Sequence, residues 1–390
     1  MRINKKMKSL FVCVCLCITQ VIFSQNLVSV NIDPTNTPKG KLMLSDLIES
    51  IEYIPLETKD NCLIGEVSFF DVSKNFILVY CRKTQTVYLY KRDGSFVRQI
   101  GNFGQGPGEY LGVYDIFIDE NKNELILSTT GKHLFFNLSG KHLRTIDISK
   151  MHMYLWIYYN NQFLSGSPSG VYPGTFPVYT IWTLDMQQIN SFIQSVPVEH
   201  KEIGGVAIKD RDGPLISKYM YKNKHYVRET DLNDTVYVVN NNNLTPKYIL
   251  NTGKYGVTAV EKGIFDIDLF AKFAHVISVA ETEAYILFRY KYKNAMNCAY
   301  YKKDSGKLEY FNTNEDGIPN NYDGGLDFWP KKQINNEWYC FHDAYDFQEK
   351  ASKHKALSPI ISQTSSQKFK NVVKKLDPDD NPVLVIAKIK

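Results

Sequence analysis

The residues of this chain whose spacing could support chemistry begin with a glycine-rich stretch. Glycines stand at 101, 104, 106 and 108. Closely spaced glycines let backbone N–H groups surround a phosphate, but a phosphate loop continues into the N-terminus of a helix. Residues 110–114 have the composition of a strand instead, so we interpret the stretch as a connection between strands that requires positive φ. The polar side chains that such a connection could turn toward a ligand are Gln105, Glu109 and Tyr110.

A second segment has the oxygen pattern of a calcium loop. Residues 312–323 place oxygen-bearing side chains at the first, third, fifth and twelfth positions and Gly317 at the sixth. The pattern is imperfect, because the first residue is Asn312 and the last is an aspartate where a longer glutamate normally reaches the ion. We therefore favour a turn over a calcium site and predict no other cofactor. The ligands of such a calcium site would be Asp316 and Asp323.

Signatures of hydrolases are missing. The segment 166–170 has Pro168 where a nucleophile elbow needs serine. The eight histidines do not follow the two-ligand spacing of a zinc helix. His342 is the one histidine with nearby carboxylates that could tune it, Asp343 and Asp346, and we interpret it as a surface residue at a strand end.

Aromatic side chains provide the remaining chemical feature. Residues 156, 158, 159, 328 and 329 are aromatic and fall in or near predicted loops, where exposed rings could stack on a sugar or a partner. We expect Trp182 and Trp338 to lie in the core, because they fall within strands. Trp156 and Trp329 are therefore the aromatic candidates for ligand contacts.

The first 24 residues have the pattern of a secretory signal peptide. Arg2, Lys5, Lys6 and Lys8 precede an apolar segment, 10–23, that is shorter than a membrane span. We predict cleavage after Ser24, a single domain over 25–390 and no transmembrane span in the mature chain. The cysteines of the segment follow Val or Leu, which disfavours a lipid anchor. The protein is expected to be exported, to the periplasm or the extracellular space, and to be associated with the cell envelope if it has a partner there.

The net charge and the cysteine content limit the possible partners and disulfide bonds. The chain has 46 basic and 41 acidic residues, and because four of the basic ones precede the cleavage site, the mature chain is nearly neutral. This balance argues against nucleic acid as a partner. Four cysteines remain after cleavage, and we expect buried thiols, with Cys298–Cys340 as the disulfide to test. They are Cys62, Cys81, Cys298 and Cys340.

These features must be positioned by strands that repeat along the chain. Segments 76–80, 87–90 and 96–100 predict three strands, with a tight Asp93-Gly94 turn before the last one. About 46 residues later, 125–127, 134–137 and 142–146 match them, and an entering strand precedes each group at 68–72 and 114–118. Three further groups follow at 162–192, 226–250 and 284–311, with a short helical insertion expected at 267–273. Each group is a four-stranded unit.

Late strands at 337–342 and 382–389 supply one more unit. The sequence thus predicts an all-β protein, a six-bladed β-propeller of four-stranded blades closed by pairing of the terminal strands. We expect the alternating segment 27–32 to pair with terminal material as a clasp. A short C-terminal helix at 366–376, with an apolar stripe, is expected to cover one end. A β-solenoid is the alternative fold.

Several segments resemble a six-bladed β-propeller family of secreted and lipid-anchored Bacteroidetes proteins, similar in architecture to NHL-repeat propellers. They are LSDLIESIEYIPLE at 44–57, GNFGQGPGEY at 101–110, DTVY at 234–237, GGLDFWP at 324–330 and DNPV at 380–383. The resemblance covers roughly 40–390. It implies a fold and a compartment, and no catalytic residues, because the family has no agreed activity.

We draw two main functional hypotheses from the sequence. The first is an exported, non-enzymatic binding or interaction protein whose ligand is a small molecule, a glycan, a peptide or an envelope protein. The second is a metal-assisted hydrolase or lyase, such as a lactonase, with ligands that converge on the propeller axis. A structural partner of an envelope assembly is a third reading.

Overall fold

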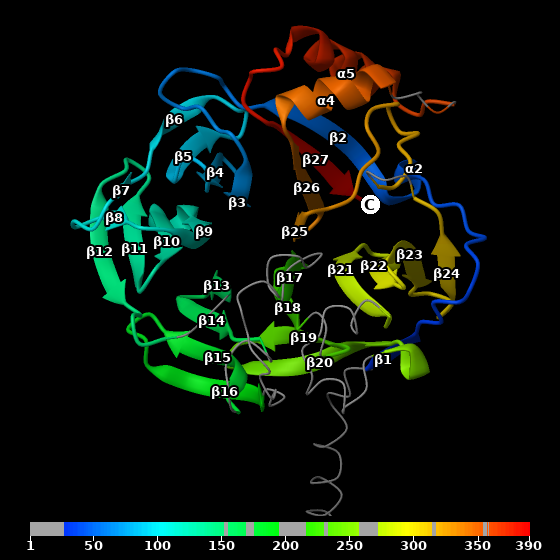
Figure 1. Ribbon diagram of the computed structural model, residues 1–390, viewed down its shortest axis with the longest axis horizontal. Coiled ribbons are helices and arrows are strands. Elements are labelled where there is room, and N and C mark those ends of the chain that lie inside the picture. Colours follow the sequence, from blue (N-terminus) through cyan, green and yellow to red (C-terminus); the bar gives the residue numbers. More distant parts are fainter. Residues whose placement is uncertain are drawn as a thin grey trace, which may run out of the picture.

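The computed structural model describes residues 27–151, 155–168, 175–194, 216–229, 233–256, 272–313, 317–353, 357 and 359–390. The predicted signal peptide and most of the predicted insertion at 267–273 lie outside these residues. In the described part the chain is all-β with few helices, and small antiparallel sheets surround a centre in a propeller-like arrangement (Figure 1). This confirms the predicted fold class in its coarse form.

Four of the sheets are separate and have four antiparallel strands each, in chain order from the centre outward. Their strands are β3 (Val67–Val72), β4 (Phe76–Cys81), β5 (Thr86–Lys91) and β6 (Phe96–Gln99); β9 (Val113–Asp119), β10 (Glu124–Thr129), β11 (Lys132–Asn137) and β12 (His142–Asp147); β13 (Leu155–Tyr159), β14 (Gln162–Gly166), β15 (Pro177–Thr183) and β16 (Gln188–Gln194); and β21 (His275–Glu281), β22 (Tyr285–Tyr292), β23 (Ala295–Lys302) and β24 (Leu308–Phe311).

The remaining long strands form one nine-stranded sheet, in the order β1-β20-β19-β18-β17-β25-β26-β27-β2. They are β1 (Val28–Asn31), β2 (Ile48–Pro55), β17 (Ile216–Tyr221), β18 (Lys224–Glu229), β19 (Thr235–Asn240), β20 (Asn243–Asn251), β25 (Lys332–Ile334), β26 (Glu337–His342) and β27 (Val383–Ile389). The prediction of six separate blades is therefore wrong for the described residues. Four separate blades are present, because β17 and β25 pair in parallel at Met220 and Ile334 and join strands expected in two different blades.

Chain closure differs from the prediction in one partner. The C-terminal strand β27 is tied into a sheet as expected, between β26 and β2. The segment 27–32 does not take part, because β1 pairs in parallel with the outer strand β20. Strand β2, at 48–55, supplies the N-terminal half of the closure. Strands β1 and β2 are both apolar enough to pair with the C-terminal strand. Which of them does so depends on the sheet edge that is free beside each strand.

The core lies between neighbouring sheets, and β4 shows why its sequence is a continuous apolar run. Ile77 and Val79 belong to one buried cluster, whereas Leu78 and Tyr80 belong to the next. Successive side chains of a strand point to opposite faces, so both faces of this sheet are covered by its neighbours. Because the sheets pack face to face around the centre, the first strand of each separate sheet lies at the centre of the molecule (Figure 1).

Shorter elements complete the described chain. The glycine-rich stretch forms β7 (Asn102–Phe103) and β8 (Glu109–Tyr110), and two 3-10 turns are η1 (Glu120–Lys122) and η2 (Gly253–Tyr255). The helices are α2 (Leu44–Leu47), α4 (Ala344–Lys353), which the sequence did not predict, and α5 (Gln363–Lys375), which it did. Helix α5 covers β2, where the rings of Phe369 and Tyr53 lie 5.0 Å apart.

Candidate functional site

A central cavity of about 1510 Å³ is the candidate site. Its wall contains residues of the innermost strands β3, β9, β13, β17, β21 and β25, which Figure 1 shows around the middle of the molecule. Strands β3, β9, β13 and β21 each begin a separate four-stranded sheet, and β17 and β25 are neighbours in the middle of the nine-stranded sheet. Residues far apart in the sequence meet there.

Two ion pairs lie in the wall of this cavity. Lys332 of β25 donates to the carboxylate of Asp71 on β3 at 2.7 Å and to the carbonyl of Phe70 at 2.6 Å. Lys218 of β17 donates to the carboxylate of Asp115 on β9 and, at 3.0 Å, to the carbonyl of Trp156 on β13. The side chain of Lys218 is 28% exposed and that of Asp115 9% exposed, so the charges face an enclosed space. Each pair ties together two inner strands that are far apart in the sequence.

The single residue pair between β17 and β25 brings the two lysines to the same part of the wall. Met220 and Ile334 are partners in parallel strands, and each lysine stands two residues before its partner residue. Side chains two residues apart share a face of a strand, so Lys218 and Lys332 lie on the same face. Burial lowers the pKa of Lys218, with Asp115 opposing the effect and Lys332 adding to it. The two ammonium groups are thus close enough to repel each other.

His225 lies beside these lysines on the next strand. It is the cross-strand partner of Met220 and therefore shares the face of Lys218. Burial lowers the pKa of His225 to about 4; the positive charges of Lys218 and Lys332 act in the same direction, and Asp71 opposes them. The imidazole is neutral at pH 7, and its side chain lines the cavity.

Aromatic rings of the wall carry cations on their faces. The Nζ of Lys332 lies 5.3 Å from the ring centre of Phe70, and that of Lys218 lies 5.4 Å from the ring centre of Phe117. The guanidinium of Arg289 lies 4.2 Å from the ring centre of Trp329. Such contacts fix long cationic side chains against the wall without using up their hydrogen-bond donors.

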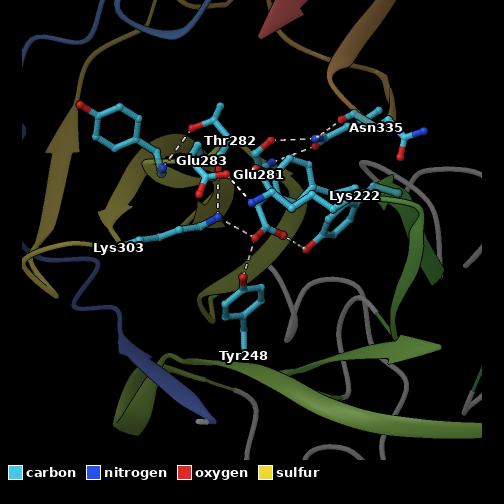
Figure 2. A network of polar contacts seen from close by, with 11 residues as sticks. Lys222, Tyr248, Glu281, Thr282, Glu283, Lys303 and Asn335 are labelled. Atoms are coloured by element: carbon cyan, nitrogen blue, oxygen red, sulfur yellow. Dashed lines mark hydrogen bonds and ion pairs between the residues drawn. The ribbon is translucent and has the colours of Figure 1, made fainter. Parts of the chain in front are cut away.

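A buried network supports one side of the cavity (Figure 2). The carboxylate of Glu281 accepts hydrogen bonds from Tyr248 at 2.6 Å, from Lys303 at 2.7 Å and from Tyr219 at 3.1 Å. The Gln333 side chain accepts from the Glu281 N–H at 2.8 Å and donates to the Glu281 carbonyl at 2.7 Å. Burial raises the pKa of Tyr219 and of Tyr248, with Glu281 adding to both shifts, so the two hydroxyls keep their protons and donate. The network fastens β17, β20, β21 and β25 together.

The polar candidates of the glycine-rich stretch lie away from this cavity. Tyr110 is fully buried, and its hydroxyl accepts from the Val87 N–H at 3.1 Å. Glu109 accepts from the Gly106 N–H at 2.8 Å, which fixes the turn of its own loop. Gln105 is exposed. None of the three lines the cavity. The predicted positive φ is confirmed at Gly101, Gly104 and Gly108.

The two tryptophan candidates are both buried, at 2% and 3% exposure. Trp156 lies in β13 rather than in a loop, and its ring packs edge-on against His133 at 4.5 Å. Trp329 lines the cavity, but Arg289 covers its ring, and its indole N–H donates to Ser278 at 3.1 Å. Neither ring is exposed for stacking as the sequence suggested. Trp338 lies in the core as expected, whereas Trp182 lies in a strand but is only partly buried.

The proposed calcium ligands are not brought to the cavity. Asp316 lies outside the described residues. Asp323 is fully buried, and its carboxylate accepts from Tyr53, Asn320 and Gly325, while burial raises its pKa. These contacts fix the 320–325 turn. In the described part of the chain, no three His, Cys, Asp or Glu side chains converge in a way that could hold a metal ion.

His342 and the cysteines have local roles. His342 ends β26, and its Nε2 lies 3.8 Å from the thiol of Cys340. Burial raises the pKa of Asp343, with Asp346 adding to it. The four thiols are free and buried, as expected, so the Cys298–Cys340 disulfide is not formed.

The functional side chains that sequence reasoning missed are single charges inside apolar inner strands. Asp71 and Asp115 follow aromatic residues in entering strands, and Lys218 stands inside β17. Burying a charge on a strand whose two faces are both covered costs free energy unless the charge is paired. A single charged residue inside an apolar strand is therefore a sequence signal that could have identified Asp71, Asp115 and Lys218. Their partners, however, come from other repeats, so spacing could not have found the pairs.

Comparison with solved structures supports the fold. A protein of Bacteroides fragilis NCTC 9343 that is assigned as exported matches with 16% identity and a TM-score of 0.67, over 94% of this chain and 100% of that one. A member of the DUF4221 family from Bacteroides vulgatus ATCC 8482 matches with 11% identity and a TM-score of 0.49, over 88% of this chain and 97% of that one.

A third similarity is to the extracellular domain of a one-component system, BT4673, of B. thetaiotaomicron, with 14% identity and a TM-score of 0.38, over 67% of this chain and 29% of that one. No curated protein matches the chain.

Within the described residues, none of the helices is long and apolar enough to cross a membrane.

The family profile described as "Domain of unknown function (DUF4934)" matches residues 27–388, which include every inner strand and every charged residue of the cavity. The chain therefore belongs to the DUF4934 family.

Proposed function

We propose that this protein is an exported binding protein that takes an anionic organic ligand into its central cavity. The observation that carries the proposal is the excess of positive charge on the cavity wall. Eight lysine and arginine side chains line it, against three carboxylates. The cations are Lys74, Arg82, Arg92, Lys218, Arg289, Lys331, Lys332 and Lys388, and the acids are Asp71, Asp115 and Glu337.

The three acids are already used within the wall. Asp71 pairs with Lys332, Asp115 with Lys218, and Glu337 with Arg92 at 2.8 Å. Lys388 pairs with Glu49 outside the cavity at 2.8 Å. The other cations leave a positive potential in a space with low-dielectric walls, which concentrates anions. Arg289 is held on the face of Trp329, so its guanidinium needs little reorganisation to meet an oxyanion.

The size and the apolar part of the wall limit the class of ligand. At about 1510 Å³, the cavity is larger than the roughly 300–1,000 Å³ of typical small-molecule sites. Apolar side chains such as Phe69, Ile157 and Met296 alternate with the cations. A ligand that fits both features carries several acidic groups on a backbone with apolar faces, as an acidic oligosaccharide or an acidic peptide does.

We further infer that the nine-stranded sheet behaves as two four-stranded blades, with β1 as an added outer strand. Its two halves share a single residue pair between β17 and β25. Counted in this way, six four-stranded units surround the cavity. Such a ring of packed sheets is rigid, and a preformed binding site needs a rigid wall. Export is supported by the N-terminal pattern and by the similarity to the B. fragilis protein assigned as exported.

Calorimetric titration with matched ligands tests the proposal. Acidic and neutral oligosaccharides of equal length, and acidic and neutral peptides of equal length, are compared at low and high salt. We expect binding of an acidic member only, weakened by salt, and weakened at least fivefold in Arg289→Gln. Lys374→Gln, which removes a charge from the exposed face of α5, serves as the matched control and should leave affinity unchanged.

Two results would overturn the proposal. Equal affinity for neutral and acidic members would show that the cationic wall does not select the ligand, and no binding of any member at low salt would remove the binding function. Product formation from esters or lactones, followed by mass spectrometry, would instead support the metal-assisted hydrolase or lyase.

A further inference from the structure

Lys218 and Lys332 each retain an unused hydrogen-bond donor. An ammonium group has three N–H donors. Lys218 uses one on Asp115 and one on the carbonyl of Trp156, and Lys332 uses one on Asp71 and one on the carbonyl of Phe70. Among the described residues, no further acceptor meets either ammonium group. Because both lysines line the cavity, a ligand in it can reach the free donor of each one.

His225 adds a group that can change its charge beside these donors. It lies on the same face through its pairing with Met220. The charges of Lys218 on β17, Lys332 on β25 and Asp71 on β3 act on its ring, and the ring centre of Tyr159 on β13 lies 5.8 Å away. The two lysines disfavour a proton on the imidazole, and Asp71 alone among these groups favours it.

We propose that Lys218 and Lys332 together bind the oxyanion of the ligand, a carboxylate, sulfate or phosphate group, and that at acidic pH His225 takes up a proton as the oxyanion binds. The inference rests on the proposed function and names the part of the cavity that recognises the acidic group. The step is a proton transfer from solvent to the imidazole, which becomes an imidazolium with both nitrogens as donors.

The direction of the proton linkage follows from the charges. Without a ligand, His225 titrates near pH 4. A bound oxyanion offsets the repulsion from the two ammonium groups and favours the imidazolium, so it raises the pKa of His225. Affinity for the oxyanion should therefore increase as the pH falls from neutral toward pH 4, because the protonated state binds more tightly.

Nuclear magnetic resonance of histidine-labelled protein tests the inference with sulfate as the probe. The pH titration of His225 is recorded in sodium sulfate and in sodium chloride at equal ionic strength, and His225→Gln identifies its signal. We expect sulfate to raise the pKa of His225 by about one unit relative to chloride. The half-buried His142 of β12, which does not line the cavity, reports the effect of salt alone and should not shift in this way.

A charge-balanced variant separates binding from folding. Lys332→Met combined with Asp71→Asn removes one lysine together with its acidic partner, and asparagine keeps an oxygen for the Ile118 N–H that Asp71 accepts at 2.9 Å. Folding is checked by circular dichroism. In this variant the sulfate-dependent shift of His225 should be lost, whereas Lys374→Met should retain it.

The outcomes distinguish this inference from the proposed function. If an acidic organic ligand binds but sulfate does not move the pKa of His225, or if the shift persists in the charge-balanced variant, the oxyanion site is wrong and the binding function stands. If sulfate moves His225 as expected but no acidic organic ligand binds at low salt, the oxyanion site stands and the proposed ligand class is wrong.

Discussion

Asn223 and Asn335 hydrogen-bond to each other across the two halves of the nine-stranded sheet. The amide of Asn335 donates to the side-chain oxygen of Asn223 at 3.0 Å, and the Asn223 N–H donates to the side-chain oxygen of Asn335 at 2.7 Å. Both residues have positive φ, which asparagine tolerates better than most residues. The Asn335 N–H also donates to the Met220 carbonyl at 2.8 Å. These bonds fasten two turns where β17 meets β25.

Asn335→Gly should lower the free energy of unfolding by about 1–2 kcal/mol, because both side-chain bonds to Asn223 are lost while glycine accepts the positive φ. Urea denaturation measures the change. Asn294→Gly, at an exposed hairpin position with the same sign of φ, is the matched control for the flexibility that glycine adds. Equal losses in the two variants would show that the Asn223–Asn335 contact contributes nothing to stability.

Glu281→Gln should destabilise the protein by about 3 kcal/mol, because Lys303 then loses its buried anionic partner. Glu283→Gln is the control two residues away, where the carboxylate pairs with Lys222 at the surface and should contribute at most about 0.5 kcal/mol. Figure 2 shows the two carboxylates in the same network. Similar midpoints of urea denaturation for the two variants would contradict the buried role of Glu281.

Stability should fall as the pH drops below 6.5, in part because of His133. Its ring is fully buried against Phe163, with ring centres 4.3 Å apart, and burial lowers its pKa from 6.5 to about 3. The unfolded chain takes up a proton below pH 6.5 and the folded chain does not, so the contribution is complete above pH 6.5 and is lost between pH 6.5 and about 3.

A double variant isolates this histidine. His133→Phe together with Ser128→Ala removes the titrating ring and its hydroxyl partner, which lie 2.9 Å apart. The free energy of unfolding of the variant should depend less steeply on pH between 6.5 and 4.5 than that of the unchanged protein. At the lower end of this range the two slopes should differ by about 1.4 kcal/mol per pH unit. An unchanged slope would mean that other groups account for the acid sensitivity.

Removal of residues 382–390 should cause aggregation or failure to accumulate. Strand β27 pairs with β26 on one side and with β2 on the other, and its residues are buried except for Lys388. The deletion exposes two strand edges and the apolar faces beside them. Lys388→Ser is the control, since its ion pair with Glu49 lies at the surface. A truncated chain that stayed monomeric, with nearly unchanged melting, would show that β27 does not hold the closure.

The sequence determined the strands and their grouping for local reasons. Runs such as 76–80 and 125–127 are apolar on both faces, and turn residues such as Gly94 separate them at a regular interval. The C-terminal strand was predictable for the same reason, because alternating Val and Ile on a chain end imply a partner. These signals concern neighbouring residues, which a sequence shows directly.

Only the tertiary structure decided which edges meet and which charges converge. Lys218 meets Asp115, and Lys332 meets Asp71, over separations in the chain that no local pattern encodes. The choice of β2 rather than β1 for closure, and the joining of β17 to β25, likewise depend on which edges are free after the other sheets have formed. The cavity exists because the propeller-like arrangement brings the inner strands of separate sheets together, and that arrangement is a property of the whole chain.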